Sequence, residues 1–63
     1  MLKVMQAKCL MPGMVMAFSN PRQNFLIDDV EWDRDGDIKV HHGNFTAVDW
    51  YEAESNVWVQ LED

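Results

Sequence analysis

Short apolar–polar alternations bounded by turn residues run along the whole chain, and this two-residue period constrains the fold more than any other feature. No stretch carries apolar residues at the i, i+3, i+4, i+7 spacing of an amphipathic helix between capping residues. Successive side chains of a β-strand point to opposite faces, so the alternation predicts half-buried strands. We expect strands over residues 2–10, 14–18, 25–32, 38–42, 45–51 and 57–61.

Residues 25–42 support the most definite prediction, a β-hairpin with a turn at residues 33–37. In this turn Gly36 can adopt a positive φ without steric cost. A register that pairs Trp32 with Ile38 produces two consistent faces. The predicted core face holds Trp32, Val30, Ile38 and Val40. The predicted outer face pairs opposite charges, Glu31 with Lys39 and Asp29 with His41.

The first predicted strand, residues 2–10, is apolar on both faces. This is typical of a central strand or of a strand covered by another chain. Cys9 lies in this strand, where we expect the thiol to be inert. The turn residues Pro12 and Gly13 then separate it from the second predicted strand.

The last predicted strand directs Val57 and Val59 inward, so Trp58 should point outward. A loop of two or four residues before this strand would pair Tyr51 with Trp58 on the outer surface and place Trp50 in the core. A loop with one residue more or fewer would exchange these assignments.

Five or six short strands in 63 residues are too few for a two-sheet sandwich, whereas a small, strongly bent antiparallel barrel leaves no exposed edge. Residues 11–15, Met-Pro-Gly-Met-Val, followed by a charged hairpin, resemble the entry to SH3-like barrels. The resemblance is one of fold, covers most of the chain loosely and has no specific motif. It implies a single small β-barrel over residues 1–63, of a kind that mostly serves as a binding module. The alternative is a five-stranded sheet that dimerises through its apolar face.

The chain is near the lower size limit for independent folding, and Cys9 is its only cysteine. An internal disulfide is therefore excluded. A bound metal or a second subunit is what remains to add stability to so small a fold. Residues 1–18 are apolar, but Lys3, Gln6 and Lys8 interrupt them early. A signal peptide needs an unbroken apolar centre, and a membrane span needs roughly 20 apolar residues. We expect a soluble cytoplasmic protein without membrane contact.

The net charge of −6 is unevenly placed, because residues 1–27 contain no acid and every Asp and Glu lies from Asp28 onward. An acidic surface repels phosphate, which disfavours direct nucleic-acid binding. It suits a protein partner with a basic surface.

The sequence contains no residue pattern typical of a catalytic or metal-binding site. The adjacent His41 and His42 point to opposite faces of a strand, and no nucleophile is paired with a base. The run from Glu31 to His42 matches a calcium loop in part, but Glu31 replaces the first Asp and His42 the bidentate Glu. Cys9 and the two histidines lack zinc-ligand spacing. We therefore predict no enzyme activity, no metal and no cofactor.

These observations favour a non-catalytic, acidic protein-binding module, an inhibitor or adaptor that docks on a basic site of a larger protein. Its predicted anchors are Trp58 and Tyr51. Its predicted steering charges are Asp29, Glu31, Asp33, Asp35 and Asp37.

Two alternatives remain open. The first is a structural subunit that forms a homodimer or larger oligomer through the Met-rich N-terminal strands. Its interface residues would be Leu2, Met5, Met14, Met16 and Phe18. The second is an aromatic platform for a small ligand or a nucleic acid, built from the three tryptophans and Tyr51.

Overall fold

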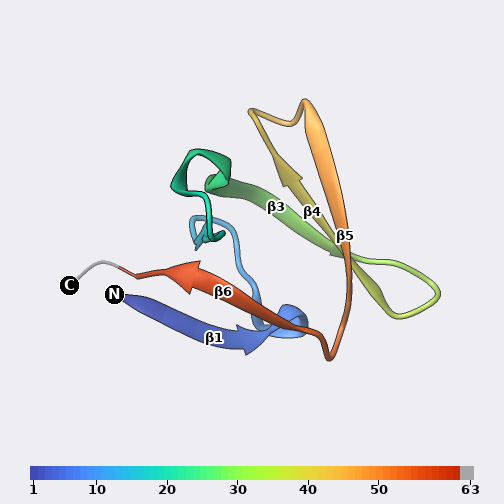
Figure 1. The fold of residues 1–63 in the computed structure, drawn as a ribbon. Helices are drawn as coiled ribbons and strands as arrows, with labels where there is room; N and C mark the ends of the chain where they lie inside the picture. The colour runs from blue at the N-terminus through green and yellow to red at the C-terminus, as the bar shows by residue number, and fades with distance from the viewer. Residues whose placement is uncertain (62–63) are drawn as a thin grey trace.

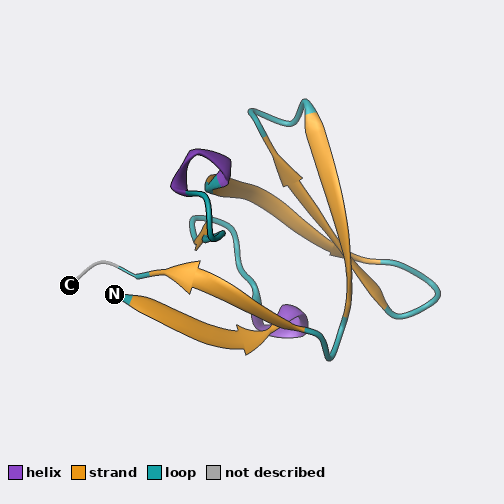
Figure 2. Cartoon of the chain, viewed as in Figure 1, coloured by secondary structure: helices purple, strands orange, loops and turns teal. Residues whose placement is uncertain are grey.

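The computed structural model describes residues 1–61 and forms a six-stranded antiparallel sheet (Figure 1). Two single-turn 3-10 helices, η1 (Ala7–Cys9) and η2 (Pro21–Gln23), interrupt the strands (Figure 2). The strands are β1 (Leu2–Gln6), β2 (Val15–Met16), β3 (Phe25–Trp32), β4 (Asp37–His42), β5 (Ala47–Glu52) and β6 (Asn56–Gln60). The all-β prediction is confirmed. No helix within residues 1–61 is long and apolar enough to span a membrane.

In the spatial order β1-β6-β2-β3-β4-β5, strand β3 pairs with β2 on one side and with β4 on the other. We call β1 and β6 the β1–β6 ribbon, and β3, β4 and β5 the β3–β4–β5 ribbon. Phe25 and Leu26 pair with β2, whereas the rest of β3 pairs with β4. The pairing slips by one residue between Ile27 and Asp29, and such an extra residue bends a strand. The β1–β6 ribbon and the β3–β4–β5 ribbon therefore run in different directions (Figure 1).

The outer strands of this order, β1 and β5, are not paired with each other. Their nearest link is η1, where the backbone N–H groups of Ala7 and Lys8 donate to the carbonyls of Ser55 and Ala53, at 2.8 and 2.9 Å. Over the described residues the sheet is strongly bent but open, so closure into a barrel stays a prediction.

The predicted β3–β4 hairpin is confirmed in register, with Trp32 opposite Ile38 and Val30 opposite Val40; β3 has the predicted bounds, and β4 begins one residue earlier than predicted, at Asp37. Gly36 has a φ of +83°, as the turn requires. The Asp33 carboxylate accepts a hydrogen bond from the backbone N–H of Asp35, an Asx-turn that fixes the first half of the loop.

The core lies inside the bend, where the inward residues of both ribbons meet. Its largest fully buried side chains are Met16, Ile27, Ile38, Val40 and Val59. The prediction that Trp32 joins this core is wrong, since its exposed fraction is 60%. Trp32 lies at the last pair before the turn, and this end of the hairpin projects beyond β1 and β6 (Figure 1), out of reach of the core.

The N-terminal strand is shorter than predicted and is an edge strand, not a central one. The bonds from Ala7 and Lys8 to the turn before β6 curl the chain into η1, so Cys9 is exposed. The second strand is also shorter than predicted. Near its end, the N–H of Phe18 donates to the side chain of Asn24 at 2.8 Å instead of to a neighbouring strand.

The predicted pairing of Tyr51 with Trp58 is wrong, because β6 pairs with β1 and β2 and not with β5. In the observed register Tyr51 lies opposite the buried Ile38 and packs against the core. Trp50 lies opposite Lys39 on the outer face, with an exposed fraction of 54%, and is not a core residue as predicted. Trp58 points outward as predicted.

Candidate functional site

The outer face of the β3–β4–β5 ribbon carries Glu31 and Asp37, two of the five predicted steering charges, together with Glu52, Lys39 and Trp50. Cross-strand pairing places Glu31 beside Lys39, Lys39 beside Trp50, and Asp37 beside Glu52. Because alternate residues share a face, all five side chains lie on one side of the ribbon. We call this surface the acidic face, and it consists of Glu31, Asp37, Lys39, Trp50 and Glu52.

Asp37 and Glu52 are the least compensated charges on the acidic face. They lie directly opposite each other, and residues so placed have Cβ atoms about 5 Å apart. In the part of the chain that the structure describes, neither carboxylate joins an ion pair. Like charges in this position destabilise a sheet, so the pair does not contribute to the stability of the fold.

The one lysine of the acidic face is turned toward an aromatic ring and not toward a carboxylate. The Lys39 ammonium lies 5.4 Å from the centre of the Trp50 ring, a cation–π contact. Glu31 instead contacts the Nε2 atom of His41 at 2.5 Å, diagonally across the strands. The predicted Glu31–Lys39 register is therefore correct, but the predicted charge pairing within it is wrong.

The remaining acids near this ribbon include several with structural roles. The Asp29 carboxylate accepts from the N–H of Val30 at 2.9 Å, and Asp33 holds the turn. Asp28 accepts from the N–H of Phe45 at 3.0 Å and so joins β3 to the β4–β5 loop. Asp35 lies exposed in the turn. The predicted row of acids is thus partly a set of backbone caps.

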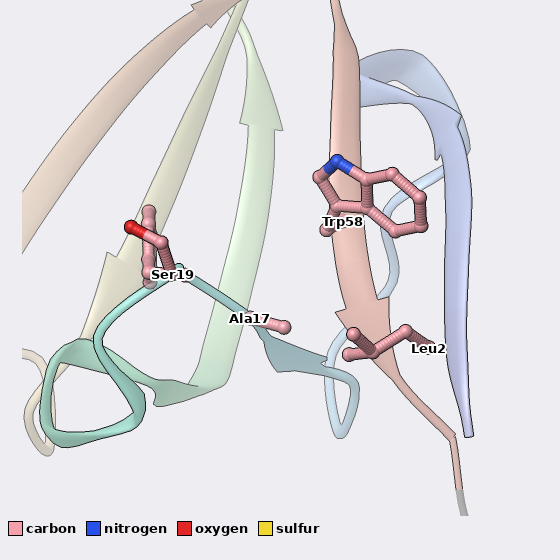
Figure 3. A pocket seen from close by; sticks show the side chains of 5 residues that line it. Leu2, Ala17, Ser19 and Trp58 are labelled. Atoms are coloured by element: carbon pink, nitrogen blue, oxygen red, sulfur yellow. The ribbon is translucent and has the colours of Figure 1, made fainter.

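Trp58 lies in a different region, at an apolar hollow of 360 Å³. Figure 3 shows Trp58 and Leu2 on one side of this hollow and Ala17 and Ser19 on the other. We call it the Trp58 groove, lined by Leu2, Ala17, Phe18, Ser19 and Trp58. A neighbouring hollow of 250 Å³ shares three of these residues and also includes Tyr51.

The structure does not bring the acidic row and the predicted Trp58 anchor together. The β3–β4 turn projects away from β1, β6 and both chain ends (Figure 1). The aromatic residues that lie beside the acids are Trp50 and Trp32.

The sequence contained little signal for the exposure of Trp50. Alternate residues of strand β5 form two sets, 47, 49 and 51 on one face and 48, 50 and 52 on the other. Each set contains an apolar residue, an aromatic residue and an acid. Alternation alone therefore cannot decide which set faces inward. The β4–β5 loop decides it, by placing His42 opposite Ala47.

A second cluster, missed in the sequence, lies on the inner face of β4 and β5. His42 stacks on Phe25 with ring centres 3.8 Å apart, and its Nε2 atom lies 3.4 Å from a carboxylate oxygen of Asp49. The hydroxyl of Tyr51 donates to the other carboxylate oxygen at 3.1 Å. Desolvation by burial and the charge of Asp49 raise the pKa of Tyr51 to about 12. At neutral pH this phenol is a hydrogen-bond donor and a poor nucleophile.

The residues of the predicted oligomer interface do not form one surface. Met16 is fully buried, and Met5, Met14 and Phe18 are half-buried and pack against the core. Of the five, only Leu2 and Phe18 line the Trp58 groove. Among residues 1–61, no group of three or more His, Cys, Asp or Glu side chains is arranged to hold a metal ion.

Comparison of the chain with protein-family models, with curated proteins and with solved structures finds no match. The two surfaces differ in chemistry. The Trp58 groove is apolar, whereas the acidic face carries opposed carboxylates that join no ion pair among residues 1–61.

Proposed function

We propose that the chain is a non-catalytic protein-binding module that docks through its acidic face on a basic site of a larger protein, as an inhibitor or adaptor. The observation that carries this proposal is the opposed pair Asp37–Glu52 beside the exposed ring of Trp50. In the free chain the pair costs stability. A Lys or Arg of a partner would convert that cost into a favourable interaction.

Trp50 supplies the apolar anchor that a charged surface needs for lasting contact. Tryptophan is enriched among the residues that dominate binding energy at interfaces. On the same face Lys39 lies opposite Trp50. Glu52 and the exposed Val48 lie two residues to either side along β5, so the ring has polar groups on two sides, as at the border of an interface centre. Trp50 therefore replaces Trp58 and Tyr51 as the proposed anchor.

The SH3-like barrel remains part of the proposal. The bend at residues 27–29 and the contact of η1 with the turn before β6 support it, because they bring the outer strands toward each other. A cytoplasmic location also remains proposed. The exposed free thiol of Cys9 suits a reducing compartment.

Affinity capture from a native lysate tests the proposal. The wild-type chain is compared with the double variant Asp37→Asn/Glu52→Gln and with Trp50→Ala. The control is Met11→Lys/Gln23→Lys, which changes the net charge by the same amount at exposed positions outside the acidic face, Met11 in a loop and Gln23 in η2. We expect a captured basic protein to be lost with the first two variants and retained with the control. The wild-type capture should also weaken at high salt.

Two results would contradict this function. One is capture that is unaffected by Asp37→Asn/Glu52→Gln and by Trp50→Ala. The other is an equal loss with the control, which would show a general response to net charge.

The aromatic-platform alternative also keeps a specific basis in the Trp58 groove, since the strands around it, β1, β2 and β6, carry no acid. Titration of tryptophan fluorescence with oligonucleotides at low and high salt tests it, and a salt-insensitive, unchanged signal would reject it.

A further inference from the structure

The outer edge of β1 carries backbone groups that point away from the sheet. The N–H of Leu61 donates to the carbonyl of Met1 at 2.7 Å, and the N–H of Ala7 donates to Ser55 at 2.8 Å. Hydrogen-bonded and non-hydrogen-bonded pairs alternate along an antiparallel ladder, so residues 1, 3, 5 and 7 bond toward β6. Leu2, Val4 and Gln6 therefore direct their N–H and C=O groups outward, and within residues 1–61 no further strand pairs with this edge.

The side chains along the same edge are apolar and exposed. Val4 lies opposite Trp58, and the exposed fractions of these side chains are 47% and 52%. Leu2, two residues away on the same face, is 56% exposed. An edge strand with outward hydrogen-bonding groups and an exposed apolar row is a template for another strand.

The distribution of charge decides along which edge two copies of the chain can meet. Two copies of a chain with a net charge of −6 repel each other over most of their surfaces. The strands β1, β2 and β6 contain no acid, and Lys3 is their only charged side chain. The other edge, β5, carries Asp49 and Glu52. Two copies can therefore meet along β1 with the least repulsion.

We propose that two copies of the chain pair antiparallel along β1, about a twofold axis at Val4. In this register Val4 faces Val4 of the second copy, and Leu2 faces Gln6. Lys3 then faces Met5 of the second copy on the opposite side of the ribbon. Each outward N–H and C=O of Leu2, Val4 and Gln6 gains a partner, and the interface is isologous, as a closed dimer requires.

Neighbouring registers are less favourable. An axis at Lys3 would place two ammonium groups opposite each other, and like charges in that position are destabilising. An axis at Met5 would leave Leu2 beyond the pairing. The axis at Val4 also forms one apolar row across four strands, in which the Val4 side chains of both copies lie between their Trp58 rings.

The contact is small, which sets the kind of dimer expected. A strand of five residues spans about 17 Å. Edge pairing of this length buries less than the ~800 Å² per partner of a standard interface. We therefore expect a concentration-dependent equilibrium between monomer and dimer. The acidic faces remain free, since the β3–β4 turns point away from β1 (Figure 1).

Sedimentation equilibrium over a range of concentrations tests the proposal on tag-free protein. The variant is Val4→Lys. The matched control is Val48→Lys, which makes the same change at an exposed valine on the outer face of the other edge strand, β5. We expect the wild type and the control to dimerise as concentration rises. Val4→Lys should stay monomeric throughout that range, with an unchanged far-ultraviolet circular dichroism spectrum.

Mixing Val4→Lys with Val4→Glu tests the register itself. Each variant alone should be monomeric, and the mixture should recover a heterodimer, because opposite charges then face each other at the axis. A wild type that is monomeric at every concentration overturns the proposal. So does dissociation by Val48→Lys but not by Val4→Lys. A mixture that stays monomeric overturns the axis at Val4.

Discussion

Individual residues in the β4–β5 loop show how strongly a short turn is specified. Gly43, Asn44 and Phe45 all have positive φ values, of 65°, 57° and 66°. Phe45 is unusual in this conformation, which bulky residues rarely adopt. Its N–H bond to Asp28 and its contact with the His41 ring, with centres 6.0 Å apart, hold it in place.

The two hairpin glycines should differ in their tolerance of a side chain. Gly36→Ala adds a Cβ that meets nothing within 4 Å, so only the backbone conformation opposes it, at about 1 kcal/mol. At Gly43 the Cβ would lie 2.8 Å from the hydroxyl of Thr46, which must then move. We expect Gly43→Ala to lower the free energy of unfolding more than Gly36→Ala in urea denaturation. Equal losses would contradict the steric account.

Tyr51 should make stability fall at high pH. The folded pKa of about 12 lies above the unfolded value of about 10, so the fold favours the protonated phenol. This contribution is complete below pH ~10 and is lost as the pH rises toward 12. Because Tyr51 is the only tyrosine, its ultraviolet absorbance reports the titration of one group. Unfolding curves of wild type and Tyr51→Phe should converge as the pH rises, and parallel curves would contradict the assignment.

Among the elements, the β4–β5 pair combines a well-packed inner face with a strained outer one. Ile38 and Val40 are fully buried on the inside, whereas Asp37 faces Glu52 on the outside. Such a conflict between local preference and fold is expected mainly where function requires it.

Removing one charge of this pair should therefore stabilise the isolated chain. We expect Asp37→Asn to raise the free energy of unfolding by about 0.5 kcal/mol, because a like-charge cross-strand pair is relieved. Asp35→Asn, in the exposed turn, is the control and should have a smaller effect. Chemical denaturation at low salt measures both. If Asp37→Asn lost stability, the carboxylate would have an internal role and the acidic face would lose its main support.

At the scale of the whole molecule, the open sheet separates two kinds of surface. The acidic face belongs to the β3–β4–β5 ribbon, and the apolar edge belongs to the β1–β6 ribbon. The bend at residues 27–29 points the acidic turn away from both chain ends (Figure 1). A dimer through β1 would therefore present two acidic faces outward.

The β3–β4 hairpin could be predicted because the residues that determine its register lie within the hairpin itself. Alternation, opposite charges and the Asp-Arg-Asp-Gly-Asp turn all select the register that pairs Trp32 with Ile38, and the structure has that register. The β5–β6 pairing was wrong because alternation fixes faces and not neighbours. Trp58 therefore pointed outward as predicted, but beside Val4 and not beside Tyr51.

From sequence alone, the two-residue period determined that the chain forms antiparallel strands, and the charged turn at residues 33–37 determined that β3 pairs with β4. Only the tertiary structure decided that β6 inserts between β1 and β2, and that Trp32 and Trp50 are exposed. The physical reason is that pairing of distant strands depends on how the whole chain buries its apolar faces. No local pattern of residues records that arrangement.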